Sequence, residues 1–387
     1  MKELLKPSLN WLLVFVPATA ITHYAFHESS TLTFIFACIS VIPLAGWMGR
    51  ATEHLAENTS EGIGGLLNAT FGNAAEFIIA FFALRSGLTE IVKASLTGSI
   101  IGNILLVLGA AFLGGGLRHT SQRFNARGAR AQATLLTLAA IALVAPAAFH
   151  HVADAEALAS EKALSVGISI VLLVAYGLGL LFSLKTHKHL FDGRAVEAAV
   201  EGEAEEPAAE TKHHGGHGGH GEHGGHGTPW SIKKSLTVLV IATTFVAWIS
   251  EILVETVEHA AETMSMNSVF IGVIVVAVIG NAAEHSTAIL VALKNRMDLS
   301  IGIAIGSSIQ VALFVAPLLV LLSHVVAPQP MDLVFTLPEV VAVALAVAIT
   351  AQIAGDGDSN WLEGVLLLAV YLILGIVFYY LPGDLTP

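Results

Sequence analysis

The pentapeptide Gly72-Asn73-Ala74-Ala75-Glu76 recurs without change as Gly280-Asn281-Ala282-Ala283-Glu284, 208 positions further along the chain. Two more blocks accompany it in the same order. Gly98-Ser99 falls at the same shift on Gly306-Ser307, and Glu53-His54-x-Ala56-Glu57 recurs as Glu258-His259-x-Ala261-Glu262. Three matched blocks in one order indicate an internal repeat that divides the chain into two related halves.

The composition around this repeat is that of a membrane protein. Of the 387 residues, 55% are hydrophobic and 12% are charged, and the mean hydropathy is +0.74. Soluble domains carry about 25% charged residues, and a soluble chain this apolar would aggregate. The apolar residues form consecutive runs of the length that a spanning helix needs, about 20 residues, rather than the alternating pattern of a membrane β-barrel. We therefore predict an all-α polytopic membrane protein.

The apolar runs predict about eleven transmembrane helices. They lie near 9–26, 31–57, 65–84, 95–115, 131–149, 163–184, 235–261, 268–293, 299–323, 334–353 and 361–381. The first run resembles a signal peptide, but we expect a retained helix because the charge pattern then fits best. With the amino terminus in the cytoplasm, fifteen Lys and Arg residues fall on the cytoplasmic side and three on the other. This bias predicts a cytoplasmic amino terminus and an extracytoplasmic carboxyl terminus.

Four regions follow from the spans. An N-terminal helix occupies 1–30, a first five-helix repeat 31–184, a linker 185–234 and a second five-helix repeat 235–387. The linker is acidic, and its stretch 213–227 holds six His and eight Gly residues, a composition that cannot form a core. Because each repeat has an odd number of spans, the second enters the membrane the opposite way round. Inverted repeats are typical of secondary transporters, with the substrate site near the midplane.

Glu76 and Glu284 are the candidate centre of that site. Both lie inside apolar runs, where an ionisable side chain is costly and indicates a function. The alternative is a protonated glutamate that only bonds neighbouring helices. Asn73 and Asn281 precede the two acids by three positions, so amide and carboxylate share a helix face. The glycines before them, Gly72 and Gly280, permit close helix approach or a local break.

The spans near 95–115 and 299–323 supply a second polar layer. Its members are Ser99 and Asn103 in the first half and Ser307, Ser308 and Gln310 in the second. Hydrogen bonding between helices is an alternative role for each of them. Together with the two acids they offer only oxygen ligands, which suit a hard cation such as calcium, and two carboxylates balance a divalent charge. The pattern does not favour zinc or copper.

Further acidic residues flank this centre. Glu53 and Glu57 end one predicted helix at the cytoplasmic side, and Glu258 and Glu262 end another at the opposite side. Glu251 and Glu255 extend the second row along one helix face. We interpret the rows as cation-attracting vestibules, with solvated helix ends as the alternative, and expect Glu53 and Glu258 to lie deeper. His285 beside Glu284 is a candidate for proton transfer or a structural histidine.

A family resemblance rests on these motifs. The stretches Asn68–Glu76, Gly280–His285 and Gly306–Gln310 closely resemble the signature repeats of calcium/proton antiporters of the calcium/cation antiporter superfamily. The resemblance covers nearly the whole chain and implies an eleven-helix fold in which Glu76 and Glu284 bind calcium and exchange it for protons. By position, Asn73, Asn281, Ser99, Ser307 and Gln310 match the residues that line the family's cavity. Asn103 has Val311 at its repeat position, and the His/Gly tract is outside the family's pattern.

Exchange also follows from the carboxylates, since either calcium or protons neutralise the pair. No Walker motif supports ATP drive, so we expect no cofactor. No serine/lysine or paired-aspartate arrangement in the spans supports an intramembrane hydrolase, so we expect no enzymatic activity. The alternatives are a sodium- or potassium-coupled calcium exchanger, disfavoured because neither acidic motif contains proline, and a divalent-cation channel. The expected partners are calcium ions, protons and the lipid bilayer, without nucleic acid, and the oligomeric state is left open. The expected location is a bacterial inner membrane, with a vacuolar membrane as the alternative.

Overall fold

The computed structural model describes residues 9–26, 29–59, 61–187 and 230–382, and helices dominate it. The first half contains η1 (Leu9–Val14), α1 (Phe15–Ala25), α2 (Ser30–Glu57), α3 (Glu61–Phe71), α4 (Ala74–Arg85), α5 (Thr89–Ile101), η2 (Gly102–Val107), α6 (Leu108–Arg118), β1 (Gln122–Arg123), α7 (Ala126–Val152), α8 (Ala155–Leu158), α9 (Glu161–Leu181) and η3 (Phe182–Thr186). The His/Gly tract 213–227 lies outside the described residues.

The second half repeats this order. It contains α11 (Ile232–Thr263), α12 (Ser268–Phe270), η5 (Ile271–Val276), α13 (Ala277–Gly280), α14 (Ala282–Ala292), α15 (Met297–Gln310), η6 (Val311–Val315), α16 (Ala316–Val326), α17 (Leu337–Ile353), β2 (Asp358–Ser359) and α18 (Trp361–Tyr380). Side chains fix several helix starts. Asn125 caps α7 and Ser231 caps α11, and capping boxes begin α17 and α18.

The prediction of an all-α polytopic membrane protein is confirmed. Among the described residues, seven helices are long and apolar enough to cross a membrane, and an eighth crossing arises if the pair bent by 61° between α13 and α14 counts as one span. The apolar helices Leu9–Ala25 and Leu337–Ile353 are shorter, and α3 and α4 meet at a break. The count of eleven spans stays a prediction.

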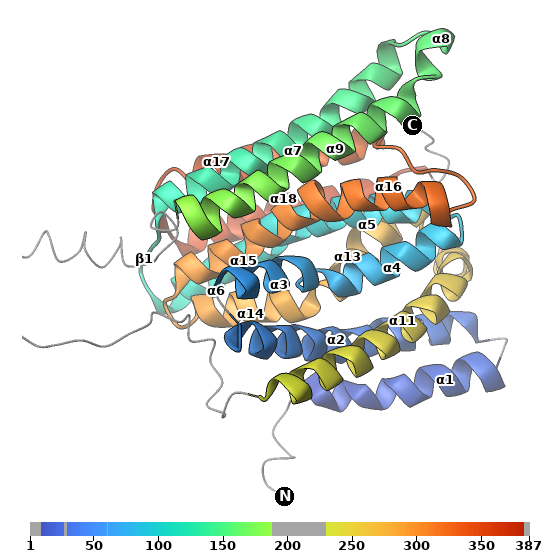
Figure 1. Cartoon of the computed structure of the whole chain (residues 1–387), viewed down its shortest axis with the longest axis horizontal. Helices are drawn as coiled ribbons and strands as arrows, with labels where there is room; N and C mark the ends of the chain where they lie inside the picture. Colours follow the sequence, from blue (N-terminus) through green and yellow to red (C-terminus); the bar gives the residue numbers. More distant parts are fainter. Residues whose placement is uncertain (1–8, 27–28, 60, 188–229, 383–387) are drawn as a thin grey trace, which may run out of the picture.

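The two halves run in opposite directions. In Figure 1 the chain passes leftward through α2 and α5 and rightward through α11 and α15. The two halves also share a local feature. At corresponding positions of the repeat, α5 continues into the π-helical turn η2, and α15 continues into the π-helical turn η6. The halves are thus an inverted repeat in structure as well as in sequence. The region boundaries assigned from the sequence stay predictions.

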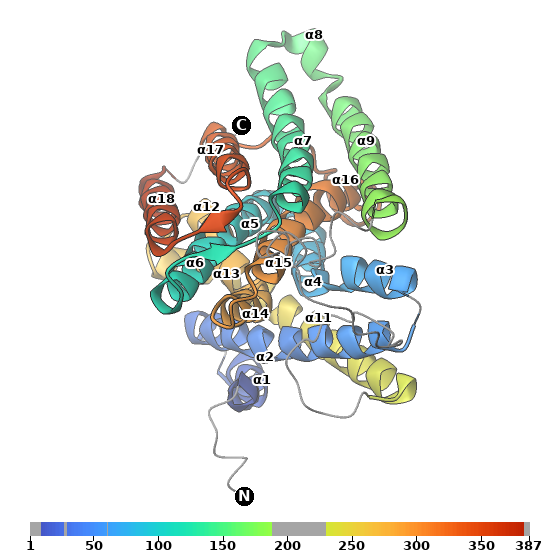
Figure 2. The ribbon, with the colours of Figure 1, turned by 90° about the vertical axis from the view of Figure 1, so that its left-hand side faces the viewer.

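The helices form layers around a central group. Figure 2 shows α4, α5, α13 and α15 in the middle, with α1, α2 and α11 on one side and α7, α9, α17 and α18 on the others. At one end β1 and β2 pair antiparallel, Gln122 with Ser359 and Arg123 with Asp358, and this ribbon ties the two halves together. We call this the β1 end and the opposite extremity the α8 end (Figure 1). The central helices carry the candidate site.

Candidate functional site

Both candidate glutamates follow a helix break. Asn73 (φ −99°, ψ 23°) and Asn281 (φ −97°, ψ 1°) leave helical geometry at matching positions, and α4 and α14 begin directly after them. Glu76 and Glu284 therefore stand in the first turn of a new helix, where unpaired backbone N–H groups favour negative charge. The break that the glycine-asparagine pair permits is present in both halves.

Each glutamate lies against the break of the other half. A Cβ atom on Gly280 would lie 3.0 Å from Cγ of Glu76, and a Cβ atom on Gly72 would lie 3.4 Å from Oε1 of Glu284. The missing side chains of these glycines therefore leave the space that the opposite carboxylate fills. The two carboxylates are close enough for their charges to interact. The inverted repeat thus brings together two acids that are far apart in sequence.

Polar side chains from both halves surround Glu76. Its Oε1 accepts hydrogen bonds from Ser99 Oγ and Asn281 Nδ2. Asn281 also donates to the carbonyl oxygen of Ala277 at 3.0 Å, which fixes the amide at the break. In the described part of the chain, Oε2 of Glu76 and Oε2 of Glu284 are buried without a hydrogen-bond donor. Buried carboxylate oxygens in this state are suited to a cation or a proton.

A second chain of hydrogen bonds connects the other predicted residues. Asn73 Nδ2 donates to Gln310 Oε1 at 2.7 Å, and Ser307 Oγ donates to Asn73 Oδ1 at 2.9 Å. Asn103 Nδ2 donates to Ser307 Oγ at 3.1 Å, and Asn103 Oδ1 lies 3.1 Å from His285 Nε2. Asn103 and His285, whose roles the sequence left open, therefore belong to one network with the oxygen ligands.

The remaining candidates lie further out. Ser308 donates to the backbone oxygens of Ile100 and Ala304 rather than to the site. Glu53 is half-buried, and its charge acts on Glu284, whereas its repeat partner Glu258 is exposed, unlike the expected deeper position. The other acids lie on the surface, with Glu57 bonded to His54 at 2.9 Å, Glu255 3.5 Å from His23, Glu251 4.0 Å from Arg85, and Glu262 exposed.

The site is closed toward the α8 end by a crossing of α5 and η5. A Cβ atom on Gly98 would overlap the carbonyl oxygen of Val273, and one on Gly272 would lie 2.5 Å from Cβ of Ala94. The backbones are thus in direct contact. The cavity beside Glu76 measures only about 10 Å³, about the space of one water molecule. The described residues therefore leave little space beside Glu76 on this side of the site.

The matching positions toward the β1 end are open. Among the described residues, no atom lies within 4 Å of a Cβ atom built on Gly302 or Gly306, the counterparts of Ala94 and Gly98. Gly65 of α3, the counterpart of Val273, faces Leu184 instead. Figure 2, which looks onto this end, places α3 at the side of the bundle and α15 near its centre. The sequence analysis did not identify this asymmetry, although Gly64-Gly65 and Gly302-x-x-x-Gly306 are its sequence signal.

An inverted repeat with two broken helices and a shared polar centre defines the class of secondary transporters. Residues 29–185 and 234–380 match the family model described as sodium/calcium exchanger protein, and the chain belongs to this family. The resemblance to its calcium/proton antiporter branch, recognised from the Gly-Asn-Ala-Ala-Glu motifs, is confirmed by close relatives.

The chain is 44% identical over 371 residues to the Ca²⁺/H⁺ antiporter of Aphanothece halophytica, covering 96% of each chain. It is 47% identical to the Ca²⁺/H⁺ antiporter ChaA of Bacillus subtilis strain 168, covering 92% of this chain and 94% of the relative. The structure of native YfkE superposes with a TM-score of 0.78 at 42% identity, over 97% of this chain and 100% of that one. The crystal structure of the H⁺/Ca²⁺ exchanger CAX shares the fold, with a TM-score of 0.64 at 15% identity over 96% of this chain and 91% of that one.

Proposed function

We propose that the chain exchanges calcium for protons across a membrane, with Glu76 and Glu284 as the shared binding groups. The observation that carries the proposal is the buried carboxylate pair, whose Oε2 atoms have no donor among the described residues. The names of relatives with 44 to 47% identity support the same exchange. The transport needs no cofactor and no enzymatic step, because the two ions compete for the same oxygens.

The ligand chemistry favours calcium. The pair supplies two negative charges, which a divalent cation balances. Ser99 and Asn281 contact Glu76, and Asn73 belongs to the second hydrogen-bond chain, so hydroxyl and amide groups lie around the pair. Calcium takes six to eight oxygen ligands in flexible geometry. No group of three or more His, Cys, Asp or Glu side chains among the described residues could hold a metal ion, so the proposed ligands are the two carboxylates with amide and hydroxyl oxygens. Gln310, Ser307 and Asn103 would support these ligands through the second hydrogen-bond chain.

Obligatory exchange follows from the cost of an empty site. Two bare carboxylates in a low-dielectric centre repel each other and are poorly solvated, so the empty carrier does not change its access. Calcium or protons remove this charge, and either loaded form changes access. Each transport direction therefore needs its own ion.

The asymmetry supports a specific access change. The crossing of Gly98 with Val273 corresponds, through the repeat, to a contact of Gly306 with Gly65. The contact of Ala94 with Gly272 corresponds likewise to one of Gly302 with Gly64. The two contacts expected between α3 and α15 involve four glycines, Gly64, Gly65, Gly302 and Gly306. Because glycine has no side chain, α3 and α15 can approach as closely as α5 and η5 do. We infer that one crossing forms when the other separates, so that the site opens alternately to the two ends.

The positive-inside bias supports a cytoplasmic location of the β1 end. Arg118, Arg127 and Arg296 lie near this end, whereas Arg85 is the last residue of α4 at the other. The state described here would thus be open to the cytoplasm. A bacterial inner membrane agrees with the bacterial relatives, and the vacuolar calcium ion transporter of Schizosaccharomyces pombe, 37% identical, represents the alternative location.

The test is the initial calcium flux in oriented vesicles while the pH is varied on one side at a time. Acid on the calcium-loading side should raise the apparent KM for calcium with little change in the maximal rate, because protons occupy the same carboxylates. Acid on the opposite side should accelerate turnover by loading the returning carrier. Flux that persists with a sodium gradient and no pH gradient would favour the sodium-coupled alternative. Flux that follows voltage alone would favour a channel.

A further inference from the structure

An apolar groove lies on the outside of the α1, α2 and α11 layer, away from the glutamate pair. Its volume is about 740 Å³, within the range of small-molecule sites. The lining is almost entirely apolar and comes from three helices, with Val16 and Pro17 on α1, Leu44 and Trp47 on α2, and Ile241 and Phe245 on α11. Because α2 and α11 are long and apolar enough to cross a membrane, we infer that the groove opens to lipid rather than to water.

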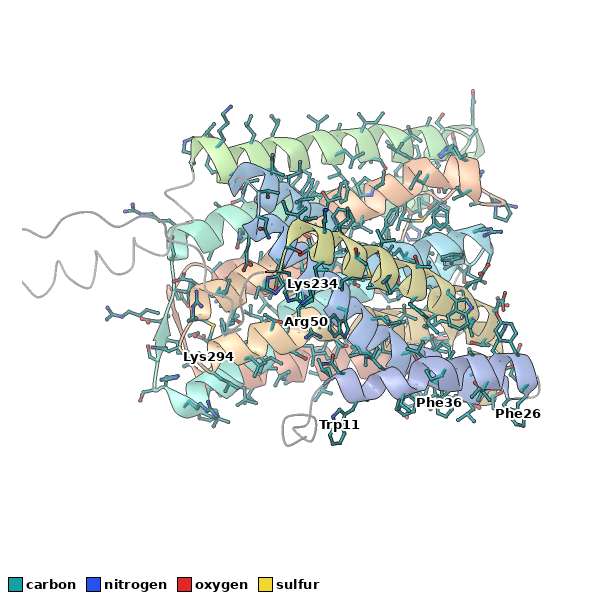
Figure 3. All side chains as sticks on the ribbon, turned by 60° about the horizontal axis from the view of Figure 1, so that its bottom comes forward. Trp11, Phe26, Phe36, Arg50, Lys234 and Lys294 are labelled. Atoms are coloured by element: carbon teal, nitrogen blue, oxygen red, sulfur yellow. The ribbon has the colours of Figure 1, made fainter. Side chains whose placement is uncertain are left out.

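Two cationic side chains lie at one end of this groove. Arg50 follows the groove residue Trp47 by three positions on α2, and Lys234 precedes the groove residue Val238 by four positions on α11. The chain directions of α2 and α11 are opposite, so both positions fall beyond the same end of the groove. Figure 3 shows the two residues next to each other. Both are exposed.

A tryptophan stack holds the two cations at one level. The Arg50 guanidinium lies 4.5 Å from the centroid of the Trp47 ring, and the Lys234 ammonium lies 4.3 Å from that of Trp230. The two indole rings stack with centroids 5.9 Å apart. Asn58 donates to the backbone oxygen of Trp230 at 3.0 Å, which ties the start of α11 to the end of α2. Tryptophan and cations at a groove end are typical of the membrane interface.

The third helix of the groove also reaches this end. Arg50 Nη2 donates to Asn10 Oδ1 at 3.2 Å, and Arg50 Nε donates to the backbone oxygen of Gly46 at 3.2 Å. The carboxylate of Glu53 acts on Arg50 and offsets part of its charge. Lys233 beside Lys234 is exposed and adds a cation. Among the described residues, this end of the groove therefore carries three cations, with Glu53 beside Arg50 and Glu57 paired to His54, whose ring lies 4.6 Å from that of Trp230.

We propose that this groove binds an anionic phospholipid, with one acyl chain between α1, α2 and α11 and the phosphate at Arg50 and Lys234. An acyl chain gains no hydrophobic free energy when it moves from the bilayer into the groove, because the bilayer is equally apolar. Selectivity must then come from the head group. Guanidinium groups bind phosphate through paired hydrogen bonds, and each cation near the membrane surface favours an anionic lipid by about fivefold.

The experiment measures tryptophan quenching in the full chain reconstituted in phosphatidylcholine bilayers. Trp47 and Trp248 line the groove, so a brominated acyl chain bound there quenches their fluorescence. We expect brominated phosphatidylglycerol to quench at a mole fraction roughly tenfold lower than brominated phosphatidylcholine, given about fivefold per cation and partial compensation by Glu53. Equal quenching by the two lipids would overturn the proposal.

Two sets of variants separate the head-group contact from the groove. The double variant R50Q/K234Q should lose the preference for the anionic lipid, and the charge-conserving variant R50K/K234R should keep it. The control variant K294Q should also keep the preference, because Lys294 is an exposed cation away from the groove (Figure 3). Ala20→Phe, which fills the groove, should reduce quenching by both lipids. A preference unchanged in R50Q/K234Q would contradict the head-group site. Unchanged quenching in the Ala20→Phe variant would contradict the acyl-chain site. Absence of quenching by either brominated lipid, as expected if a second copy of the chain covers the groove, would contradict it as well.

Discussion

Two regions of the molecule correspond through the internal repeat but differ in packing. One is the crossing of α5 with η5, and the other is the region of α3 and α15. At the crossing, Ile271 and Val273 are fully buried, with 0% of their surface exposed. At the matching positions on α3, Ile63 is 54% exposed and Gly65 contacts Leu184. Sequences related by the repeat thus adopt two arrangements in one molecule. Among the described residues, only one of the two matching regions therefore forms a close backbone contact.

The largest expected effect concerns the residues that both arrangements share. Glu76→Gln and Glu284→Gln should each reduce calcium exchange at least a hundredfold, because the amide keeps the shape but removes the charge and the proton site. Initial calcium flux in vesicles measures the loss, and circular dichroism checks that the variants fold. Glu262→Gln, an exposed acid at the end of α11, is the matched control and should retain most of the flux. Near-normal exchange in either central variant would remove the pair from the mechanism.

The second largest effect on exchange is expected from a bulky side chain between α3 and α15. Gly306→Leu meets open space in the present arrangement, so the protein should fold and bind calcium from the β1 end. The side chain would obstruct the approach of α3 to α15, and exchange should fall at least tenfold. Gly177→Leu, which also adds a leucine in open space but on the outside of α9, is the control for the added bulk. Turnover equal to that of the control would mean that α3 and α15 never close.

The same substitution at matched glycines should lower stability at one position and leave it almost unchanged at the other. Gly98→Ala forces the α5 and η5 backbones apart, since its Cβ atom would overlap the carbonyl oxygen of Val273, and should cost about 1 to 3 kcal/mol. Gly306→Ala meets no described atom within 4 Å and should leave the thermal midpoint almost unchanged. Thermal unfolding in detergent compares the two variants. Equal losses of stability at both positions would contradict the assigned asymmetry.

The smallest effect is expected at Gly302. Its repeat partner is Ala94, which already packs against Gly272 at the closed crossing, so an alanine fits the contact that we propose for α15 and α3. Gly302→Ala should therefore change the exchange rate less than twofold. A loss as large as that of Gly306→Leu would show that the proposed contact is tighter than its counterpart. The flux assay used for the other variants measures this difference.

The sequence predicted the repeated features of the molecule and missed those in which the halves differ. Gly72 and its copy Gly280 predicted either close helix approach or a local break, and the structure has a break at both positions. The polar residues near Ser99 and Ser307 also come together as their repeat positions suggested. Each of these features depends on local sequence that both copies share.

The unpredicted features depend on contacts between distant segments. The hydrogen bond of His285 with Asn103 joins the two halves, and no neighbouring residue indicates it. Glu53 and Glu258 occupy matching positions, yet Glu53 is half-buried and its charge acts on Glu284, whereas Glu258 is exposed. Matching local sequence therefore does not indicate how far each acid is buried.

We propose that closure of α3 on α15 alternates with the closed crossing of α5 on η5. The variant Gly65→Cys/Gly306→Cys, in a background with the native Cys38 replaced by serine, tests this alternation. We predict that a disulfide between positions 65 and 306 forms during calcium and proton turnover, that it stops exchange, and that reduction restores the flux. The claim would be contradicted if no disulfide formed during active turnover, or if the cross-linked protein continued to exchange calcium.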